Sequence, residues 1–119
     1  MSAHPLHPSS TAVIDAARQR GGALVALESS VLAQGLLPPF NREAATRMMQ
    51  AVEAAGATPV ITAIARGVPS FGLDDDALER FLARDGVRKV SARDLGIAVA
   101  DGADGATTVA ATLAMCALG

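Results

Sequence analysis

The sequence has few aromatic residues: three Phe, and no Trp or Tyr, among 119 residues. Proteins that bind single-stranded nucleic acid stack the bases on aromatic side chains, so this scarcity argues against such a platform. The formal net charge is −2, and positive and negative residues are interspersed without the basic stripe that would follow a phosphate backbone. The composition therefore disfavours a nucleic-acid-binding protein.

Cysteine is also scarce. The single Cys116 cannot form a disulfide within the chain, and it lies in an apolar helical pattern. We therefore expect it to be a small core residue in a reducing compartment. No apolar run approaches the roughly 18 residues of a membrane span, and the first residues lack the layout of a secretory signal. The expected location is the cytoplasm.

Familiar site motifs are missing as well. His4 and His7 have no cysteine or carboxylate at metal-ligand spacing, so the pattern does not predict a zinc site. The sequence contains no GxGxxG, P-loop or GxSxG motif. The common nucleotide-binding and hydrolase signatures are therefore excluded.

The residues that are present favour a layered fold. Half of them are hydrophobic, mostly small aliphatic types, and apolar runs alternate with helical patterns along the chain. The expected order is a helix at 12–20, a strand at 23–27, a helix at 42–56, a strand at 57–65, a helix at 75–84, a strand at 87–91 and a final helix after 105. This alternation predicts an α/β fold with a mostly parallel sheet flanked by helices, an α/β/α arrangement. We expect residues 1–9 to be flexible and residues 10–119 to form the N-terminal portion of one such domain.

Capping and breaking residues set the expected element boundaries. Ser10 or Thr11 can cap the first helix, Asn41 the second and Asp74 the third. The Pro38-Pro39 pair interrupts regular structure, so QGLLPPF is expected to be a connection. A short strand containing Pro69 is expected at a sheet edge.

Glu28 directly follows the apolar run ALVAL. In open α/β sheets, ligands bind beyond the carboxyl ends of the strands, and a partly shielded acid there can donate a proton near neutral pH. A strand-end acid can equally be solvated or cap the next element. The pattern makes Glu28 a candidate proton donor and leaves the structural alternative open.

Two later segments are also ambiguous. Lys89, in VRKVS, is either an exposed edge-strand lysine that prevents aggregation or a cation for a phosphate or carboxylate. The segment GATTV, residues 105–109, is either a phosphate-binding loop at a helix start or an ordinary Thr-capped helix. The helix that follows is apolar on nearly every side, so we expect a partner or a downstream half to cover it.

Four segments occur together, in order, over roughly residues 12–119: ALESS with QGLLPPFN, GATPVITAIARGVPSFGL, RKVSARDL and GATTVAATLAMCA. In this combination the chain resembles the N-terminal part of the pseudouridine-5'-phosphate glycosidases. The resemblance implies an α/β/α fold and reversible cleavage of the C–C glycosidic bond of pseudouridine 5'-phosphate to uracil and ribose 5-phosphate. It also implies a homotrimer and a divalent metal, typically manganese.

The resemblance assigns roles to three residues. Glu28 matches the family's proton donor, a role that makes chemical sense because the base carbon must be protonated as the C–C bond breaks. Lys89 matches a substrate contact, which we expect to be made to the phosphate. Val109 matches another substrate contact, which a valine can make only through its backbone or by packing. No metal ligand is assigned within the chain.

The chain also departs from the family pattern. Ser30, Gln34 and Leu37 stand where the family usually has Thr, His and Pro; Ser30 keeps the hydroxyl, and Gln34 can still form hydrogen bonds but cannot titrate. The resemblance places the lysine nucleophile and a metal-binding acid downstream of the matched segment. We therefore expect an N-terminal piece, from a truncated gene, a split gene or a partial sequence, that is inactive alone. The alternative is a non-catalytic module that binds a phosphosugar or forms oligomers.

Overall fold

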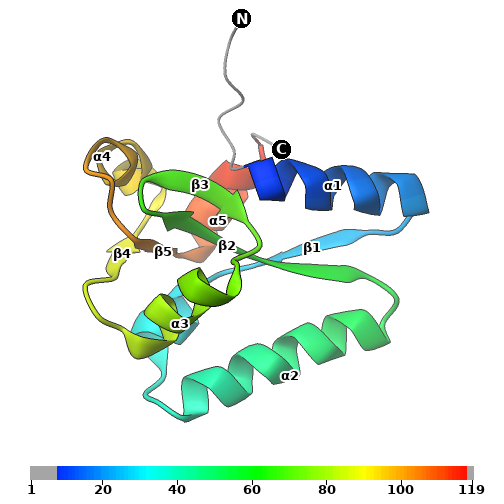
Figure 1. Ribbon diagram of the computed structural model, residues 1–119, viewed down its shortest axis with the longest axis horizontal. Helices are drawn as coiled ribbons and strands as arrows, with labels where there is room; N and C mark the ends of the chain where they lie inside the picture. The colour runs from blue at the N-terminus through cyan, green and yellow to red at the C-terminus, as the bar shows by residue number, and fades with distance from the viewer. Residues whose placement is uncertain (1–7, 118–119) are drawn as a thin grey trace, which may run out of the picture.

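The computed structural model describes residues 8–117, which form helices packed on a five-stranded sheet (Figure 1). The elements in chain order are α1 (Pro8–Arg20), β1 (Leu24–Leu27), the π-helical turn η1 (Val31–Gly35), α2 (Phe40–Ala54), β2 (Thr58–Ala65), β3 (Val68–Phe71), α3 (Asp75–Ala83), β4 (Arg88–Val90), the 3-10 turn η2 (Ala92–Asp94), α4 (Leu95–Ala100), β5 (Gly105–Thr107) and α5 (Val109–Cys116). Within this part of the chain, no helix is long and apolar enough to cross a membrane.

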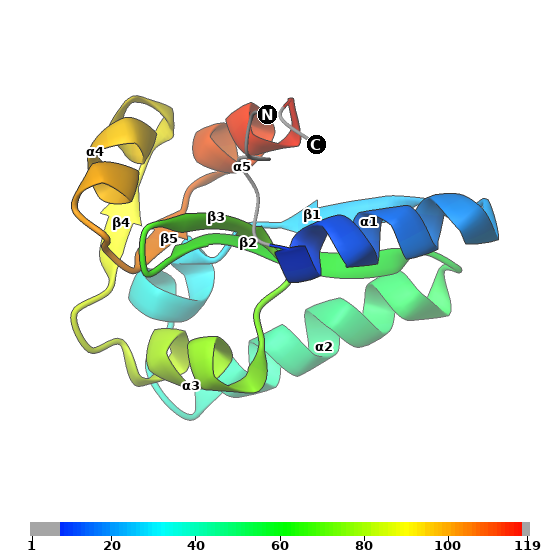
Figure 2. The same ribbon diagram turned by 45° about the horizontal axis from the view of Figure 1, so that its top comes forward.

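The sheet has the strand order β1-β2-β5-β4, and β3 pairs with β2. The β1–β2 and β4–β5 pairs are parallel, whereas β2 pairs with both β3 and β5 in antiparallel fashion. Helices α2 and α3 cover one face, and α1, α4 and α5 lie on the other (Figures 1 and 2). The predicted α/β sheet flanked by helices is confirmed, and its antiparallel pairings make it a mixed sheet.

Strand β2 is the centre of the sheet. Its first half pairs with β1, and its second half pairs with β3 and β5. Because both of its faces are covered, β2 is a nearly continuous apolar run rather than an alternating one. Among the described residues, strand β3 pairs only with β2, which agrees with the edge position predicted from Pro69.

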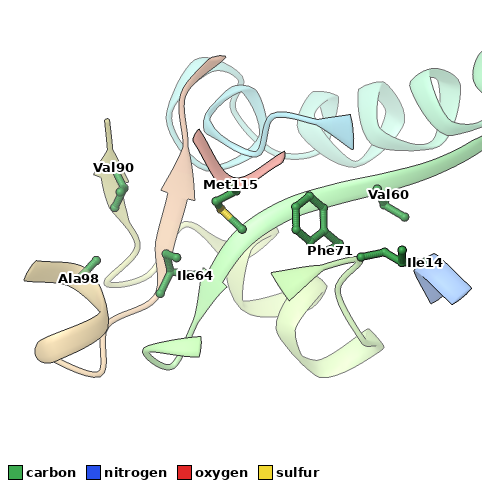
Figure 3. Packing of buried hydrophobic residues seen from close by; sticks show 7 residues of the cluster. All are labelled: Ile14, Val60, Ile64, Phe71, Val90, Ala98 and Met115. Atoms are coloured by element: carbon green, nitrogen blue, oxygen red, sulfur yellow. The ribbon is translucent and has the colours of Figure 1, made fainter. Parts of the chain in front are cut away.

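Each face of the sheet carries its own core. Alternate residues of β2 enter opposite faces, as the two-residue period of a strand requires. On the α1, α4 and α5 side lie Ile14, Val60, Ile64, Phe71, Val90, Ala98 and Met115. Figure 3 shows Ile14, Val60 and Phe71 toward one end of this cluster and Val90, Ala98 and Ile64 toward the other. On the α2 and α3 side lie Leu32, Ala45, Ile61 and Leu82, together with Ala33, Ala63, Phe81 and Ala106.

Residues 105–107 form strand β5, so their interpretation as a loop was wrong. A three-residue strand that starts with glycine has little β propensity of its own, and it is a strand because β2 and β4 pair with it. A Cβ on Gly105 would lie 2.6 Å from Cγ2 of Val90 and 3.4 Å from Cβ of Ile64. Only glycine fits where these three strands meet.

The start of the chain differs from the prediction. Residues 1–7 lie outside the described residues, whereas Pro8 and Ser9 belong to α1, whose first position suits proline. Ser10 is inside the helix rather than at its cap, and its buried hydroxyl accepts a 2.6 Å hydrogen bond from the Phe71 N–H. The helix ends before Gly21, which has a φ of 71°, as predicted.

The prediction that Asn41 caps the second helix was wrong, because α2 begins at Phe40. The buried Asn41 side chain instead donates from Nδ2 to the carbonyls of Leu32 at 3.0 Å and Leu82 at 2.8 Å. This side chain therefore joins η1, α2 and α3. The predicted Asp74 cap is confirmed, since Asp74 Oδ1 accepts from the Ala77 N–H at 2.8 Å.

Helix α5 packs through one face only. Met115 is fully buried, whereas Leu113 is 66% exposed and Val109 is 61% exposed. Cys116 is exposed, so its prediction as a core residue was wrong. The helix is apolar on almost every side, and for this reason its sequence did not show which face would be covered.

Candidate active site

The carboxyl ends of β1 and β5 meet beside Thr62 of β2. The register of β1 on β2 ends with Leu27 opposite Ile61, and β5 places Ala106 opposite Ala63. The Ser29 N–H donates to the Thr107 carbonyl at 3.2 Å, and the Thr107 N–H donates back to the Ser29 Oγ at 2.8 Å. The two strand ends are thus joined directly.

Glu28 lies at this junction, next to Ser29 in the chain. It is half-buried, and its Oε2 accepts a 3.2 Å hydrogen bond from the Ser30 Oγ. Ser30, which stands where the family usually has Thr, therefore supplies a hydroxyl that bonds to the Glu28 carboxylate. A partly shielded carboxylate held by a neighbouring hydroxyl is suited to proton transfer.

Lys89 lies on β4, paired with Ala106 of β5. Its side chain is exposed and leaves the sheet on the face opposite Val90, whose side chain is buried with Ile64 and Met115. Within residues 8–117, Lys89 forms no ion pair. This placement is compatible with both of the roles considered for Lys89.

The start of α5 has features of both alternatives considered for GATTV, a Thr-capped helix and a phosphate-binding helix start. The Thr108 hydroxyl accepts a 3.3 Å hydrogen bond from the Ala111 N–H, and the Thr108 N–H donates to Val90. The N–H groups of Val109 and Ala110, in the first turn, have no hydrogen-bond partner within the described part of the chain. The helix is therefore capped by threonine and still offers two backbone donors at its positive end.

The three predicted site residues gather around the end of β5. Glu28 is next to Ser29, which binds Thr107; Lys89 pairs with the residue before Thr107; and Val109 is two residues after it. Sequence reasoning missed the buried hydroxyls of Ser29, Thr62 and Thr107 at this point. The available signal was a threonine in the middle of the apolar run of β2.

Gln34 lies in η1 near the start of β4. Its Nε2 donates to the Val87 carbonyl at 3.2 Å, so the residue does form a hydrogen bond, whereas its buried Oε1 has no partner among the described residues. Arg84 donates to the carbonyls of Ala33 at 2.8 Å and Gln34 at 3.2 Å. These bonds hold the turn that follows Glu28.

The described residues do not fit a resident metal. Residues 8–117 contain no group of three or more His, Cys, Asp or Glu side chains that could hold a metal ion. We therefore assign manganese no role in the chemistry of these residues.

The structure also contains a cavity of about 210 Å³ on the α1 and α5 side of the sheet. Glu28, Lys89 and Val109 do not line it. Its lining is mainly apolar: Ile14, Arg18, Leu24, Ala26, Val60, Phe71 and Cys116.

Comparison with known proteins identifies the family. The family model described as "Indigoidine synthase A like protein" matches residues 13–119. The chain belongs to this family. It is 74% identical over all 119 residues to the pseudouridine-5'-phosphate glycosidase of Gemmatimonas aurantiaca, and it covers 39% of that protein. It is 47% identical over 105 residues to the enzyme of the same name from Chloroflexus aurantiacus, with 87% of the chain and 34% of that protein covered.

Two solved structures share the fold of this chain. The prealnumycin C-glycosynthase AlnA, solved with ribulose 5-phosphate, matches with a TM-score of 0.75 and 39% identity over 91% of the chain and 34% of AlnA. An indigoidine synthase A-like protein from Thermotoga maritima matches with a TM-score of 0.70 and 31% identity over 78% of the chain and 32% of that protein. The predicted resemblance is confirmed, and the chain spans about two fifths of the relative from Gemmatimonas.

Proposed function

We propose that this chain provides the proton-donor part of a pseudouridine-5'-phosphate glycosidase. The observation that carries the proposal is the position of Glu28 where the carboxyl ends of β1 and β5 join, close in the fold to the start of α5. The identity of 74% to a relative with that name supports the same chemistry.

In this proposal the Glu28 carboxyl acts as the general acid. As the bond between the sugar carbon and the base carbon breaks, the base carbon keeps the bonding electron pair and takes the Glu28 proton. The sugar carbon, which loses this pair, is proposed to bond to the amine nucleophile in the remainder of the protein, and water later releases it as ribose 5-phosphate. Glu28 is left as a carboxylate, and in the direction of synthesis it takes the proton back. Ser30 orients the carboxyl through its 3.2 Å hydrogen bond to Oε2.

The phosphate of the substrate is proposed to lie at the start of α5. The N–H groups of Val109 and Ala110 and the positive end of the helix suit an anion. Lys89 leaves the sheet on the face opposite α5, and it is proposed to reach the same phosphate around the end of β4. The relative AlnA was solved with a sugar phosphate, ribulose 5-phosphate, which supports a ligand of this class.

The remaining parts of the reaction are proposed for the whole protein. The chain covers 39% of the relative from Gemmatimonas, so the amine nucleophile and the ligands of the manganese ion are proposed to lie in the remainder. The homotrimer and the cytoplasmic location implied by the resemblance are proposals of the same kind.

A chimeric enzyme tests this function. Residues 1–119 replace the matching segment of the Gemmatimonas relative, and release of uracil from pseudouridine 5'-phosphate is measured. We expect turnover by the chimera, a fall in kcat of about 10²- to 10⁴-fold for Glu28→Gln, and mainly a higher KM for Lys89→Met. The control is Glu53→Gln, on the exposed side of α2. Full activity of Glu28→Gln would refute the proposed role.

The second candidate is a non-catalytic module that binds a phosphosugar or forms oligomers. The exposed apolar side chains of Val109 and Leu113 favour it, as do the α5 N–H donors that have no partner among residues 8–117. Calorimetric titration of the 119-residue chain with ribose 5-phosphate, together with sedimentation, separates the two candidates. Binding or assembly by the chain, with no turnover by the chimera, would favour the module.

A further inference from the structure

Four buried hydroxyl groups form one connected cluster beneath the candidate site. They come from four different parts of the chain: the residue after Glu28, β2, β5 and α5. We call Ser29, Thr62, Thr107 and Thr112 the hydroxyl cluster. All four residues are buried, and Ser29, Thr62 and Thr107 are completely inaccessible to solvent.

The members of the hydroxyl cluster contact one another. The Thr62 Oγ1 lies 2.9 Å from the Oγ1 atoms of both Thr107 and Thr112. Thr112 donates to Thr107 at 3.1 Å, and the Ser29 Oγ lies 3.3 Å from the Thr107 Oγ1. The cluster therefore joins β2, β5 and the residue after Glu28 to α5, the helix whose first turn carries N–H donors without a partner among the described residues.

The cluster also holds the backbone on both sides of Glu28. On one side, the Thr62 hydroxyl donates to the Leu27 carbonyl at 3.0 Å. On the other, the Ser29 N–H and Oγ are bound to the backbone of Thr107. Thr107 in turn donates its own hydroxyl to the Thr62 carbonyl at 2.8 Å. The peptide groups that flank Glu28 are thus anchored to β2 and β5.

Packing alone does not require these hydroxyls. Valine has nearly the shape of threonine, and a buried hydroxyl has a desolvation cost unless it is hydrogen-bonded. A fully connected polar network in a low-dielectric interior instead fixes one geometry, because each bond has a preferred length and direction. This property suits a place where a carboxyl must be held at a set position relative to a neighbouring helix.

We propose that Ser29, Thr62, Thr107 and Thr112 are positioning residues that fix Glu28 relative to the start of α5. The proposal rests on the proposed function of Glu28 as proton donor. The cluster does not touch the substrate; it acts through the backbone on either side of Glu28 and through Thr112 of α5, one turn beyond Thr108.

Amide hydrogen exchange in the 119-residue chain tests the anchoring without any need for activity. The variants are Thr107→Val, Thr107→Ser and the control Thr46→Val, which makes the same change at an exposed position of α2. The readout is the exchange rate of the Ser29 N–H relative to that of the Thr58 N–H, which binds Ala23 at the far end of the β1–β2 pair. We expect Thr107→Val to raise this ratio about tenfold, and the other two variants to keep it close to the wild-type value.

An unchanged ratio in Thr107→Val, or equal acceleration at both amides, would overturn the proposal, because the cluster would then contribute only general stability. If Thr107→Val does not fold, Thr112→Val replaces it. That change removes the contacts of Thr112 with Thr62 and Thr107 and, unlike Thr107→Val, leaves the contact between the Ser29 Oγ and the Thr107 Oγ1. The ratio is expected to rise in the same direction by a smaller factor, and no rise would overturn the proposal.

The chimera connects the cluster to Glu28. We expect Thr107→Val to lower kcat about tenfold, and Thr107→Ser to recover most of the loss. In a Glu28→Gln background, Thr107→Val should cause no further loss, since its effect passes through Glu28. An equal loss in both backgrounds would contradict the positioning role. The same assay separates the two proposals. If the proposed role of Glu28 is wrong, the Glu28→Gln chimera keeps full activity, whatever Thr107→Val does.

Discussion

Arg80 and Asp104 form an ion pair with two hydrogen bonds, from Nε to Oδ2 at 2.8 Å and from Nη2 to Oδ1 at 3.0 Å. Asp104 also accepts from the Arg66 N–H at 2.9 Å. Arg80 lies on α3 and Asp104 immediately precedes β5, so the pair ties a helix to the entrance of a strand inside the sheet. The hydrogen bond from Arg80 is the main cause that holds the pKa of Asp104 below its ordinary value of 3.8.

This pair predicts an acid-dependent loss of stability. Because the pKa of Asp104 is lower in the folded chain, its contribution is fully present above the ordinary pKa and is lost as the pH falls below about 4 through the folded value. Near neutral pH, Asp104→Asn should lower the free energy of unfolding by about 1–2 kcal/mol. The variant should also lose less stability than the wild type on acidification. Urea unfolding of the wild type and of Asp104→Asn, at neutral pH and below about pH 4, measures the two free energies of unfolding.

The matched control is Asp101→Asn. Asp101 pairs with Arg88 at 2.7 Å, but the two side chains are 48% and 49% exposed. Solvent screens such a pair, so the expected change is about 0.5 kcal/mol or less. Equal effects of the two variants would contradict the role given to the Arg80–Asp104 pair.

Asn41→Ala should destabilise the chain by about 2–3 kcal/mol. The change leaves the buried carbonyls of Leu32 and Leu82 without their side-chain donor and removes the contact between α2, η1 and α3. Urea unfolding checks the prediction, with Gln50→Ala on the exposed side of α2 as the control. A cost of less than about 0.5 kcal/mol for Asn41→Ala would show that these bonds are replaced by others.

Gly105→Ala should destabilise the chain by about 1–3 kcal/mol, because the new methyl group would overlap Val90. Shortening Val90 to alanine in the same protein should make the additional cost of Gly105→Ala smaller. The control is Gly96→Ala in α4, where a Cβ meets nothing within 4 Å. Since alanine is a better helix former, that variant should be slightly more stable. Thermal and urea unfolding compare the variants.

The two sides of α5 should respond differently to substitution. Met115 is fully buried in the α1, α4 and α5 core, so Met115→Ala should cost about 2–4 kcal/mol. Leu113 is 66% exposed, and Leu113→Lys should change the free energy of unfolding by no more than about 0.5 kcal/mol. A large loss in Leu113→Lys would mean that another copy of the chain covers this face, and sedimentation of the two variants would show it.

The parts of the fold that could be predicted are those with local signals. The Asp74 cap, the stop at Gly21 and the apolar run of β2 identified their elements directly from the sequence. Strand β5 could not be predicted, because its three residues are extended only through pairing with β2 and β4. Ser10 and Asn41 were assigned to helix caps, whereas each bonds to a backbone group distant in the sequence. Such tertiary partners override local preference.

In the candidate site, too, the features with a local signal could be predicted and those that depend on tertiary pairing could not. Glu28 was predicted from its place at the end of an apolar strand, and its half-buried position beside Ser30 agrees with that. The antiparallel β2–β5 pairing, which brings the end of β5 to the residue after Glu28, has no signature in the pattern. The roles of Glu28, Lys89 and Val109 remain predictions for the experiments above.

The hydrogen bond from the Phe71 N–H to Ser10 bears on how much of the chain forms a folding unit. The match to the family model begins at residue 13, yet α1 begins at Pro8, and the Ser10 hydroxyl reaches across to the end of β3. A protein shortened to begin at Val13 would keep every residue of the match and still leave the buried Phe71 N–H unpaired. The folded unit therefore extends N-terminal to the segment that the family model matches, and the Gemmatimonas relative, which aligns over all 119 residues, includes this extension.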